Sequence, residues 1–393
     1  MRLRINFLTT NSKPNSTQSN QRSDFFESIF AQLVTVEGDF CSYRLDIQEI
    51  TSSNQSDRFW PPFSEDLYFL HILCEGIANG DKHMTKIINK ISQADFLVVD
   101  NLFVSPLAIS AVKQNSSLRL IYISHNIESK LKLVIGHLMH WPVSFISDMI
   151  DFCMNYEMQI VKNSAVTFWC SKEDEDYFDF DSDTISIVVP NGGKKRIRSA
   201  ASKNEILNFL GCRNYVLFVS SGHPPNTYGF IQGVGLDFGF MPPDTRVVIV
   251  GSVGAYIDQM IRGTNLEETY LNKASVILDA SESLLGDLYA YSSAVILPIF
   301  QGSGTSIKAA EAFLNATTII STEFALRGLG DAILKQTPCF RAENRDQFHA
   351  LIQEVVSADG VYIEHEEKHA GSWEYLFGIF FNQIRTVFSK DLI

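Results

Sequence analysis

The sequence predicts an α/β protein made of two doubly wound domains that face a central cleft. Its 393 residues are too many for one core of ordinary size, so two domains are expected. Short β-rich runs alternate with helical runs along the chain, a pattern typical of parallel sheets with crossover helices. The alternation stops near residue 193 and starts again after residue 204, which divides the chain into two sets of similar length.

Composition excludes several classes of protein. Hydrophobic residues make up 45% of the chain and charged residues 20%, as in ordinary soluble globular proteins. The formal net charge of −13 argues against a nucleic-acid binder, because that function needs a cationic face. The six cysteines are scattered, which favours neither a zinc site nor a disulfide framework and fits a reducing cytosol.

The start of the chain predicts a cytoplasmic protein. Residues 1–8 contain too short an apolar run for a signal peptide and are typical of a first strand. No stretch reaches the length needed to span a bilayer, which leaves open only a peripheral contact at the inner face of the membrane.

The first half contains several runs that are apolar on both faces, as buried parallel strands are. We expect strands at residues 4–8, 96–100, 118–124, 165–170 and 185–189. We expect helices at residues 24–34, 82–93, 106–114 and 144–162. Residues 51–63, rich in serine and ending in Trp-Pro-Pro-Phe, are expected to form a loop. Pro-Asn-Gly-Gly at 190–193 predicts a turn that ends a domain of residues 1–193.

The second half repeats the pattern after a polar and basic run at residues 194–203, which is expected to be a linker. We expect strands at residues 215–220, 246–250, 275–278, 294–297 and 318–321. We expect helices near residues 225–236, 255–262, 284–291 and 309–316. The second domain therefore covers residues 204–370. The tail, 371–393, has aromatic and aliphatic residues at helical spacing over 373–388, which predicts a last helix.

The most informative stretch is residues 294–316, where a strand, a glycine turn and a helix follow one another. This order directs backbone N–H groups toward an anion, and Gly302 and Gly304 let the backbone approach a ligand closely. Thr305 or Ser306 can cap the helix. Glu311, about a turn and a half inside the helix, is placed to accept hydrogen bonds from sugar hydroxyls.

Two further candidates follow strands, where open α/β sheets bind ligands. His125 lies in Ser-His-Asn-Ile-Glu after the strand at 118–124, and its imidazole can form a hydrogen bond with a sugar. Gly222 and His223 follow the strand at 215–220. There a glycine permits close approach of a phosphate, and the prolines after His223 predict the start of a helix.

Several of these motifs together resemble the retaining GT-B glycosyltransferases of the family 4-like group (glycosyl transferases group 1). They are Gln-Gly-Ser-Gly-Thr-Ser-Ile-Lys-Ala-Ala-Glu at 301–311, His-Asn-Ile-Glu at 125–128, Val-Pro-Asn-Gly at 189–192, Ser-Gly-His-Pro-Pro-Asn at 221–226 and Asp-Leu-Tyr-Ala at 287–290. The resemblance covers most of residues 118–330, is strongest over 284–330 and is weak over 1–117. It implies the GT-B fold, with a C-terminal helix that packs back onto the first domain.

The resemblance also implies a chemistry. A nucleotide-diphospho-sugar would be the co-substrate, with no other cofactor and no metal, and the acceptor would be a glycan, a glycolipid or a protein. His125 would reach the donor sugar at the reacting centre, and Lys308 or His223 would add positive charge beside the leaving diphosphate. Glu311 would hold the ribose. The donor site would comprise Gly222, His223, Ser303, Gly304, Thr305, Ser306 and Glu311.

Two departures from the family pattern favour other readings. Many relatives carry an Arg and a Lys just beyond the strand at 215–220, and this chain does not. Relatives also carry a glycine pair after the first strand, whereas the loop at 9–14 has no glycine. Both departures favour a non-catalytic GT-B module that binds a glycan or a partner protein. A sugar-nucleotide epimerase of GT-B shape is a third alternative.

Overall fold

The structure is a computed structural model that describes residues 3–11, 21–34, 38–46, 50, 60–178, 184–358 and 368–387. Its internal contacts divide the chain into two compact units. Unit 1 comprises Met1–Pro190 and Phe377–Ile393, and unit 2 comprises Asn191–Leu376. Residues 12–14 of the glycine-free loop and 51–59 of the expected serine-rich loop lie outside the described residues. Within the described ranges, no helix combines the length and apolar character that a bilayer crossing requires.

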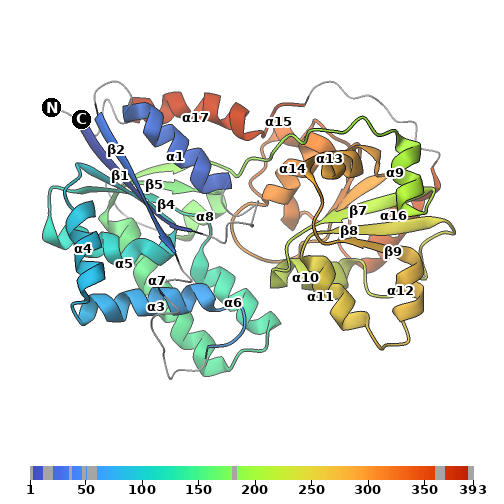
Figure 1. Cartoon of the computed structure of the whole chain (residues 1–393), viewed down its shortest axis with the longest axis horizontal. Coiled ribbons are helices and arrows are strands. Elements are labelled where there is room, and N and C mark those ends of the chain that lie inside the picture. Colours follow the sequence, from blue (N-terminus) through green and yellow to red (C-terminus); the bar gives the residue numbers. More distant parts are fainter. Residues whose placement is uncertain are drawn as a thin grey trace. The chain divides into compact units, whose positions relative to one another are not determined.

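Unit 1 contains one parallel sheet with strand order β2-β1-β3-β4-β5-β6. The strands are β1 (Leu3–Asn11), β2 (Gly38–Asp46), β3 (Phe96–Asp100), β4 (Arg119–Ile123), β5 (Ser164–Trp169) and β6 (Ile185–Val188). The helices are α1 (Gln21–Val34), α3 (Glu65–Ala78), α4 (Lys82–Ile91), α5 (Ser105–Gln114), α6 (Glu128–Leu138), α7 (Val143–Asn163) and α8 (Lys172–Tyr177), with a 3₁₀ turn η1 (Leu102–Val104). Figure 1 shows α1 on one side of this sheet and α3, α4 and α5 on the other. Helices on both faces are what makes β3 buried along its whole length.

Unit 2 has the same construction, with strand order β12-β11-β10-β7-β8-β9. Its strands are β7 (Asn214–Val219), β8 (Thr245–Val250), β9 (Ala274–Ile277), β10 (Ala294–Leu297), β11 (Ile319–Ser321) and β12 (Cys339–Arg341). Its helices are α9 (Lys203–Leu210), α10 (Pro224–Gly233), α11 (Val253–Ile261), α12 (Glu267–Lys273), α13 (Glu282–Tyr291), α14 (Ile307–Asn315), α15 (Asp331–Leu334) and α16 (Arg345–Ser357), with a 3₁₀ turn η2 (Phe324–Leu326). All strand pairs in this sheet are parallel (Figure 1).

The structure confirms the fold class and all ten strands that the sequence predicts. It adds β2 and β12, which are edge strands, and the helices α3, α6, α8, α9, α12, α15 and α16, which the sequence did not predict. The last helix, α17 (Trp373–Val387), begins in unit 2 and continues in unit 1, where Phe377 packs edge-to-face on Phe25 of α1 with ring centroids 6.2 Å apart.

The basic run expected to be a linker belongs to unit 2 and is attached to its helices by ion pairs. We call Asn191–Ser199 the strap. Three of its cations pair with acids on the helices beneath: Lys194 with Glu282 (2.8 Å), Arg196 with Glu311 (2.7 Å) and Arg198 with Asp287 (3.6 Å). A Cβ added to Gly193 would lie 2.6 Å from the backbone nitrogen of Glu311, so the strap lies directly on α14.

Candidate functional site

The predicted site residues lie at the point where the strand order reverses in unit 2, and one strand from that point in unit 1. In unit 1 the chain leaves β1 for β2 on one side and returns to β3 on the other, so this point lies between β1 and β3. In unit 2 it lies between β7 and β10. Open α/β sheets bind ligands outside the carboxyl ends of their strands at such points. His125 follows β4, one strand from the switch point of unit 1, and the glycine turn at 302–304 lies between β10 and α14.

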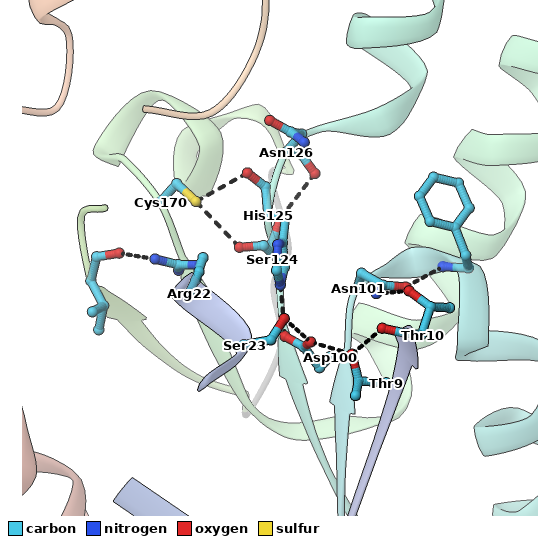
Figure 2. A network of polar contacts seen from close by, with 12 residues as sticks. Thr9, Thr10, Arg22, Ser23, Asp100, Asn101, Ser124, His125, Asn126 and Cys170 are labelled. Atoms are coloured by element: carbon cyan, nitrogen blue, oxygen red, sulfur yellow. Dashed lines mark hydrogen bonds and ion pairs between the residues drawn. The ribbon is translucent and has the colours of Figure 1, made fainter. Parts of the chain in front are cut away.

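A buried carboxylate is the centre of the unit 1 site (Figure 2). Asp100, the last residue of β3, has a fully buried side chain. One carboxylate oxygen, Oδ2, accepts hydrogen bonds from the hydroxyls of Thr9 (2.6 Å) and Ser23 (2.5 Å). The other, Oδ1, lies 2.6 Å from Nε2 of His125. Residues from β1, α1, β3 and the turn after β4 therefore converge on this one carboxylate.

Asp100 is held in its ionised form. Burial acts to raise its pKa, but the attraction of His125 and the hydrogen bonds from His125, Ser23 and Thr9 outweigh burial, and the net effect lowers the pKa below its usual value. A carboxylate that stays ionised can only accept hydrogen bonds, so each of the three groups around Asp100 is a donor.

The backbone that carries His125 is fixed by neighbouring groups (Figure 2). The buried thiol of Cys170 donates to the carbonyl oxygens of Ser124 (3.3 Å) and His125 (3.1 Å). The hydroxyl of Ser124 donates to the carbonyl of Asn126, and the amide of Asn126 donates to Glu128 (3.1 Å). The imidazole itself is 20% exposed, so it reaches the surface of unit 1 from a rigid turn.

The glycine turn of unit 2 has the conformation that the sequence predicts. Gly302 has φ of 146° and Gly304 has φ of 67°, values that disfavour any side chain. Ser306 caps α14 by accepting a hydrogen bond of 3.2 Å from the backbone N–H of Ala309. Thr305 has another function, since its hydroxyl accepts from the backbone N–H of Asn191 in the strap (3.0 Å). Of the two expected caps, Ser306 is the one used.

Two cations flank this turn. Lys308, the second residue of α14, is half-buried, and burial lowers its pKa to about 8, with repulsion from Arg327 acting in the same direction and attraction from Glu311 against it. Arg327 follows η2 and donates to the carbonyl oxygens of Ser303 (2.8 Å) and Phe324 (2.9 Å). Its guanidinium also stacks on the Phe324 ring at 3.9 Å. A positive charge is thereby fixed against the turn that was predicted to bind phosphate.

Glu311 is placed differently from the expectation of an accessible ribose contact. Its side chain is fully buried, and Oε1 accepts a hydrogen bond of 2.7 Å from Nη2 of Arg196, whose side chain is 8% exposed. A ribose could reach this carboxylate only after the side chains that cover it move.

The turn after β7 is also covered. A Cβ added to Gly222 would lie 2.1 Å from the ring of Tyr256 in α11, and the Gly222 N–H donates to the hydroxyl of Ser252 (2.9 Å). A side chain at position 222 would therefore displace the ring of Tyr256. His223 is the N-cap residue of α10 and is half-buried, and its side chain makes no capping hydrogen bond. Because β7 and β10 are paired, His223 and the glycine turn emerge from neighbouring strands.

Sequence reasoning missed two residues of these sites, Asp100 and Arg327. Asp100 ends a strand that the sequence located correctly, so its position at a strand tip was the signal that could have revealed it. Arg327 comes six residues after β11, and nothing in its local sequence relates it to a turn 24 residues earlier. In the described part of the chain, no three or more His, Cys, Asp or Glu side chains form a group that could hold a metal ion.

Comparison with known proteins gives matches at the level of structure. No family model matches the chain, and no curated protein matches it in sequence. Among solved structures, sucrose-phosphate synthase from Thermosynechococcus elongatus superposes with a TM-score of 0.67 at 14% identity, covering 99% of this chain and 100% of that one. Anabaena HepE in complex with UDP and glucose has a TM-score of 0.58 at 12% identity, with 100% and 99% covered.

A third similar structure is a trehalose-6-phosphate synthase studied for glycosyl transfer with retention, with a TM-score of 0.55 at 11% identity and 98% of both chains covered. Coverage of nearly the whole chain in each comparison shows that the protein has the GT-B fold, with two Rossmann-like units.

Proposed function

We propose that this protein is a glycosyltransferase that moves a sugar from a nucleotide-diphospho-sugar to a hydroxyl of a glycan or a lipid-linked acceptor, with retention of configuration and without a metal. The proposal rests on the arrangement of the chain after β10. There, two glycines with positive φ lead into the N-terminus of α14, and Lys308 and Arg327 lie beside the turn. The GT-B neighbour bound to UDP and glucose supports the ligand class, and the synthase that transfers with retention supports the stereochemistry.

In this proposal the protein stabilises charge more than it exchanges protons. The bond between the anomeric carbon and the diphosphate oxygen breaks, and the diphosphate leaves with the electron pair. Backbone N–H groups at the start of α14 supply about half a positive charge, and the side chain of Lys308 and the guanidinium of Arg327 supply the rest. The acceptor oxygen bonds to the anomeric carbon on the face from which the diphosphate departs. The acceptor proton goes to the departing phosphate oxygen, so no protein base is required.

Arg327 compensates for one of the two departures from the family pattern, the missing Arg and Lys after the strand at 215–220. The Arg and Lys that relatives carry beyond the first strand of the second domain are missing from this chain, but a Lys and an Arg occur beside the glycine turn instead. Two charges of a diphosphate cannot lose water without such compensation. We propose that these two cations take over the function of the missing pair.

A second candidate function is supported by the burial of Glu311 and Gly222, two residues that were predicted to contact the nucleotide. The carboxylate of Glu311 is occupied by Arg196, and Gly222 is covered by Tyr256, as expected if the chain were a non-catalytic GT-B module for a glycan or a partner protein.

Isothermal titration with UDP, GDP, ADP and TDP separates the two functions. The proposed function requires micromolar to millimolar binding of at least one diphosphate, followed by sugar transfer in the presence of EDTA from the matching nucleotide sugar. The anomeric configuration of the product, read by proton NMR, then tests retention. Absence of binding to all four would refute the transferase and leave the module.

A further inference from the structure

The two ring nitrogens of His125 have different surroundings. In the part of the chain that the structure describes, Asp100 is the hydrogen-bond partner of the ring, through Nε2 at 2.6 Å. Asp100 is fully buried and ionised, and its other oxygen already receives the hydroxyls of Thr9 and Ser23. The ring is 20% exposed, so its other side reaches solvent.

These contacts assign the proton on the ring. An ionised carboxylate offers lone pairs only, so the short contact at 2.6 Å requires a proton on Nε2. In a neutral imidazole the second nitrogen then carries a lone pair. In this neutral form Nδ1 is an acceptor, whereas both nitrogens are donors in the imidazolium. The group that fits the neutral ring is a hydroxyl, of which sugars carry several.

We infer that Asp100 is a positioning residue, which fixes His125 as the Nε2–H tautomer and so presents Nδ1 as a hydrogen-bond acceptor for a hydroxyl of the sugar substrate. This inference rests on the proposed function for the nature of the ligand, and on unit 1 alone for its geometry. Figure 2 shows the order of the contacts, from the tips of β1 and β3 through Asp100 to the ring.

The surroundings of Asp100 are built to keep it in place. Thr9 belongs to β1 and Ser23 to α1, so the carboxylate is held from two elements besides its own strand. The next residue, Asn101, has φ of 79°, an unusual value for a residue other than glycine. Its side-chain NH₂ group donates to the hydroxyl of Thr10 (3.2 Å), and its side-chain oxygen Oδ1 accepts from the backbone N–H of Phe103 (2.9 Å). Hydrogen bonds therefore hold the backbone at the end of β3 next to Asp100. The strained conformation of Asn101 persists only because these surroundings enforce it.

The test combines a spectroscopic and a kinetic measurement on the full chain. The ¹⁵N shifts of the histidine rings report which nitrogen carries the proton, and a His125→Gln variant identifies the signal of His125 among the nine histidines. We expect a protonated Nε2 and a bare Nδ1 in the wild type near pH 8. Asp100→Ala should give a mixture of tautomers and lower kcat about tenfold or more, the effect of one lost hydrogen bond to a charged group, with the affinity for nucleoside diphosphate unchanged within about twofold.

Two further variants separate positioning from folding. Asp100→Asn retains an acceptor oxygen for Nε2, and its amide N–H groups can be accepted by the hydroxyls of Thr9 and Ser23, so it should restore the tautomer and most of the turnover. Thr9→Val removes one of the two hydroxyl hydrogen bonds to Asp100, on the side away from the ring, while Ser23 and Nε2 of His125 still hold the carboxylate. The tautomer should therefore be unchanged, and kcat should fall clearly less than in Asp100→Ala.

A wild-type ring protonated on Nδ1 would overturn the inference, as would Asp100→Asn with turnover as low as that of Asp100→Ala. A loss of turnover in Thr9→Val equal to that in Asp100→Ala would show a structural role and would also overturn it. Failure of the proposed function looks different, because the chain would then transfer no sugar while the ring spectrum still reported the tautomer.

Discussion

Oε1 of Glu311 accepts a hydrogen bond of 2.7 Å from Nη2 of Arg196, and the two side chains are 0% and 8% exposed. Glu311 belongs to α14 and Arg196 to the strap, so this pair joins the strap to the helix behind the glycine turn. From the sequence alone, Glu311→Ala would be expected to weaken nucleotide binding and leave the fold intact. A buried ion pair changes the second expectation, because removal of one partner leaves the other charge buried without compensation.

We therefore expect Glu311→Ala to lower the free energy of unfolding by about 3–5 kcal/mol, measured by urea denaturation. Glu311→Gln, which retains an acceptor for Arg196, should lose less. The matched control is Arg196→Met, which breaks the same pair but keeps the carboxylate. If Glu311 also binds ribose, nucleotide affinity at a temperature where both variants are folded should fall more in Glu311→Ala than in Arg196→Met. An unfolding free energy equal to that of the wild type in Glu311→Ala would contradict the structural role.

Lys308→Met should weaken the binding of a nucleoside diphosphate about tenfold or more, while binding of the nucleoside alone stays the same. Methionine keeps most of the aliphatic stem and removes the charge. In the wild type, burial lowers the pKa of Lys308 to about 8, so the lysine is largely protonated at pH 7 and loses its proton as the pH rises through that value. Diphosphate affinity should therefore decline above about pH 8 in the wild type and be less dependent on pH in the variant. Equal affinities at pH 7 would exclude Lys308 from the site and favour His223.

Arg327→Met should have two opposite effects. Its positive charge contributes to the lowered pKa of Lys308, so its removal should raise that pKa and move the alkaline decline of diphosphate binding to higher pH. At neutral pH the affinity should fall, because the charge and the hydrogen bond to Ser303 are both lost. Arg341→Met is a suitable control, since it removes a cation of the same unit that pairs with the exposed Glu323. If diphosphate affinity declined at the same pH in Arg327→Met as in the wild type, Arg327 would have no effect on the pKa of Lys308.

His125→Ala should lower kcat more than it changes the dissociation constant of the nucleoside diphosphate. The reason is that His125 belongs to unit 1 and is assigned to the transferred sugar, whereas the nucleotide is assigned to unit 2. Steady-state kinetics with the nucleotide sugar and titration with the diphosphate measure the two quantities separately. His83→Ala, at an exposed position of α4, serves as the control. A change confined to the Michaelis constant of the donor would make His125 a ground-state contact only.

The sequence predicted the strands that are buried on both faces, because such strands need continuous apolar runs. β3, Phe-Leu-Val-Val-Asp, is one of these. β2 was missed because it is an edge strand, paired with β1 alone, in which Asp39, Cys41 and Ser42 are exposed. An edge strand can be polar without loss of stability, so its sequence resembles that of a loop.

The site was predicted less completely than the fold. Periodicity and turn chemistry located the glycine turn and its serine cap, since both depend on neighbouring residues. The partners of His125 and Glu311 are 25 and 115 residues distant, and only the folded sheet brings them together. Exposure was equally unpredictable, because the burial of Glu311 depends on a strap whose lysines and arginines are typical of a solvated linker.

The strap also changes where a protease would be expected to cut. On composition, Lys194, Lys195, Arg196 and Arg198 form the most obvious trypsin site in the run that the sequence predicts to be a linker. A protease must draw its substrate into an extended strand, and here that would break the ion pairs to α13 and α14 and the hydrogen bonds from the backbone of Arg196 and Ser199. Trypsin should thus cut this run only after unit 2 has opened locally, so the rate of cleavage reports how often unit 2 opens. Nucleotide binding should lower that rate.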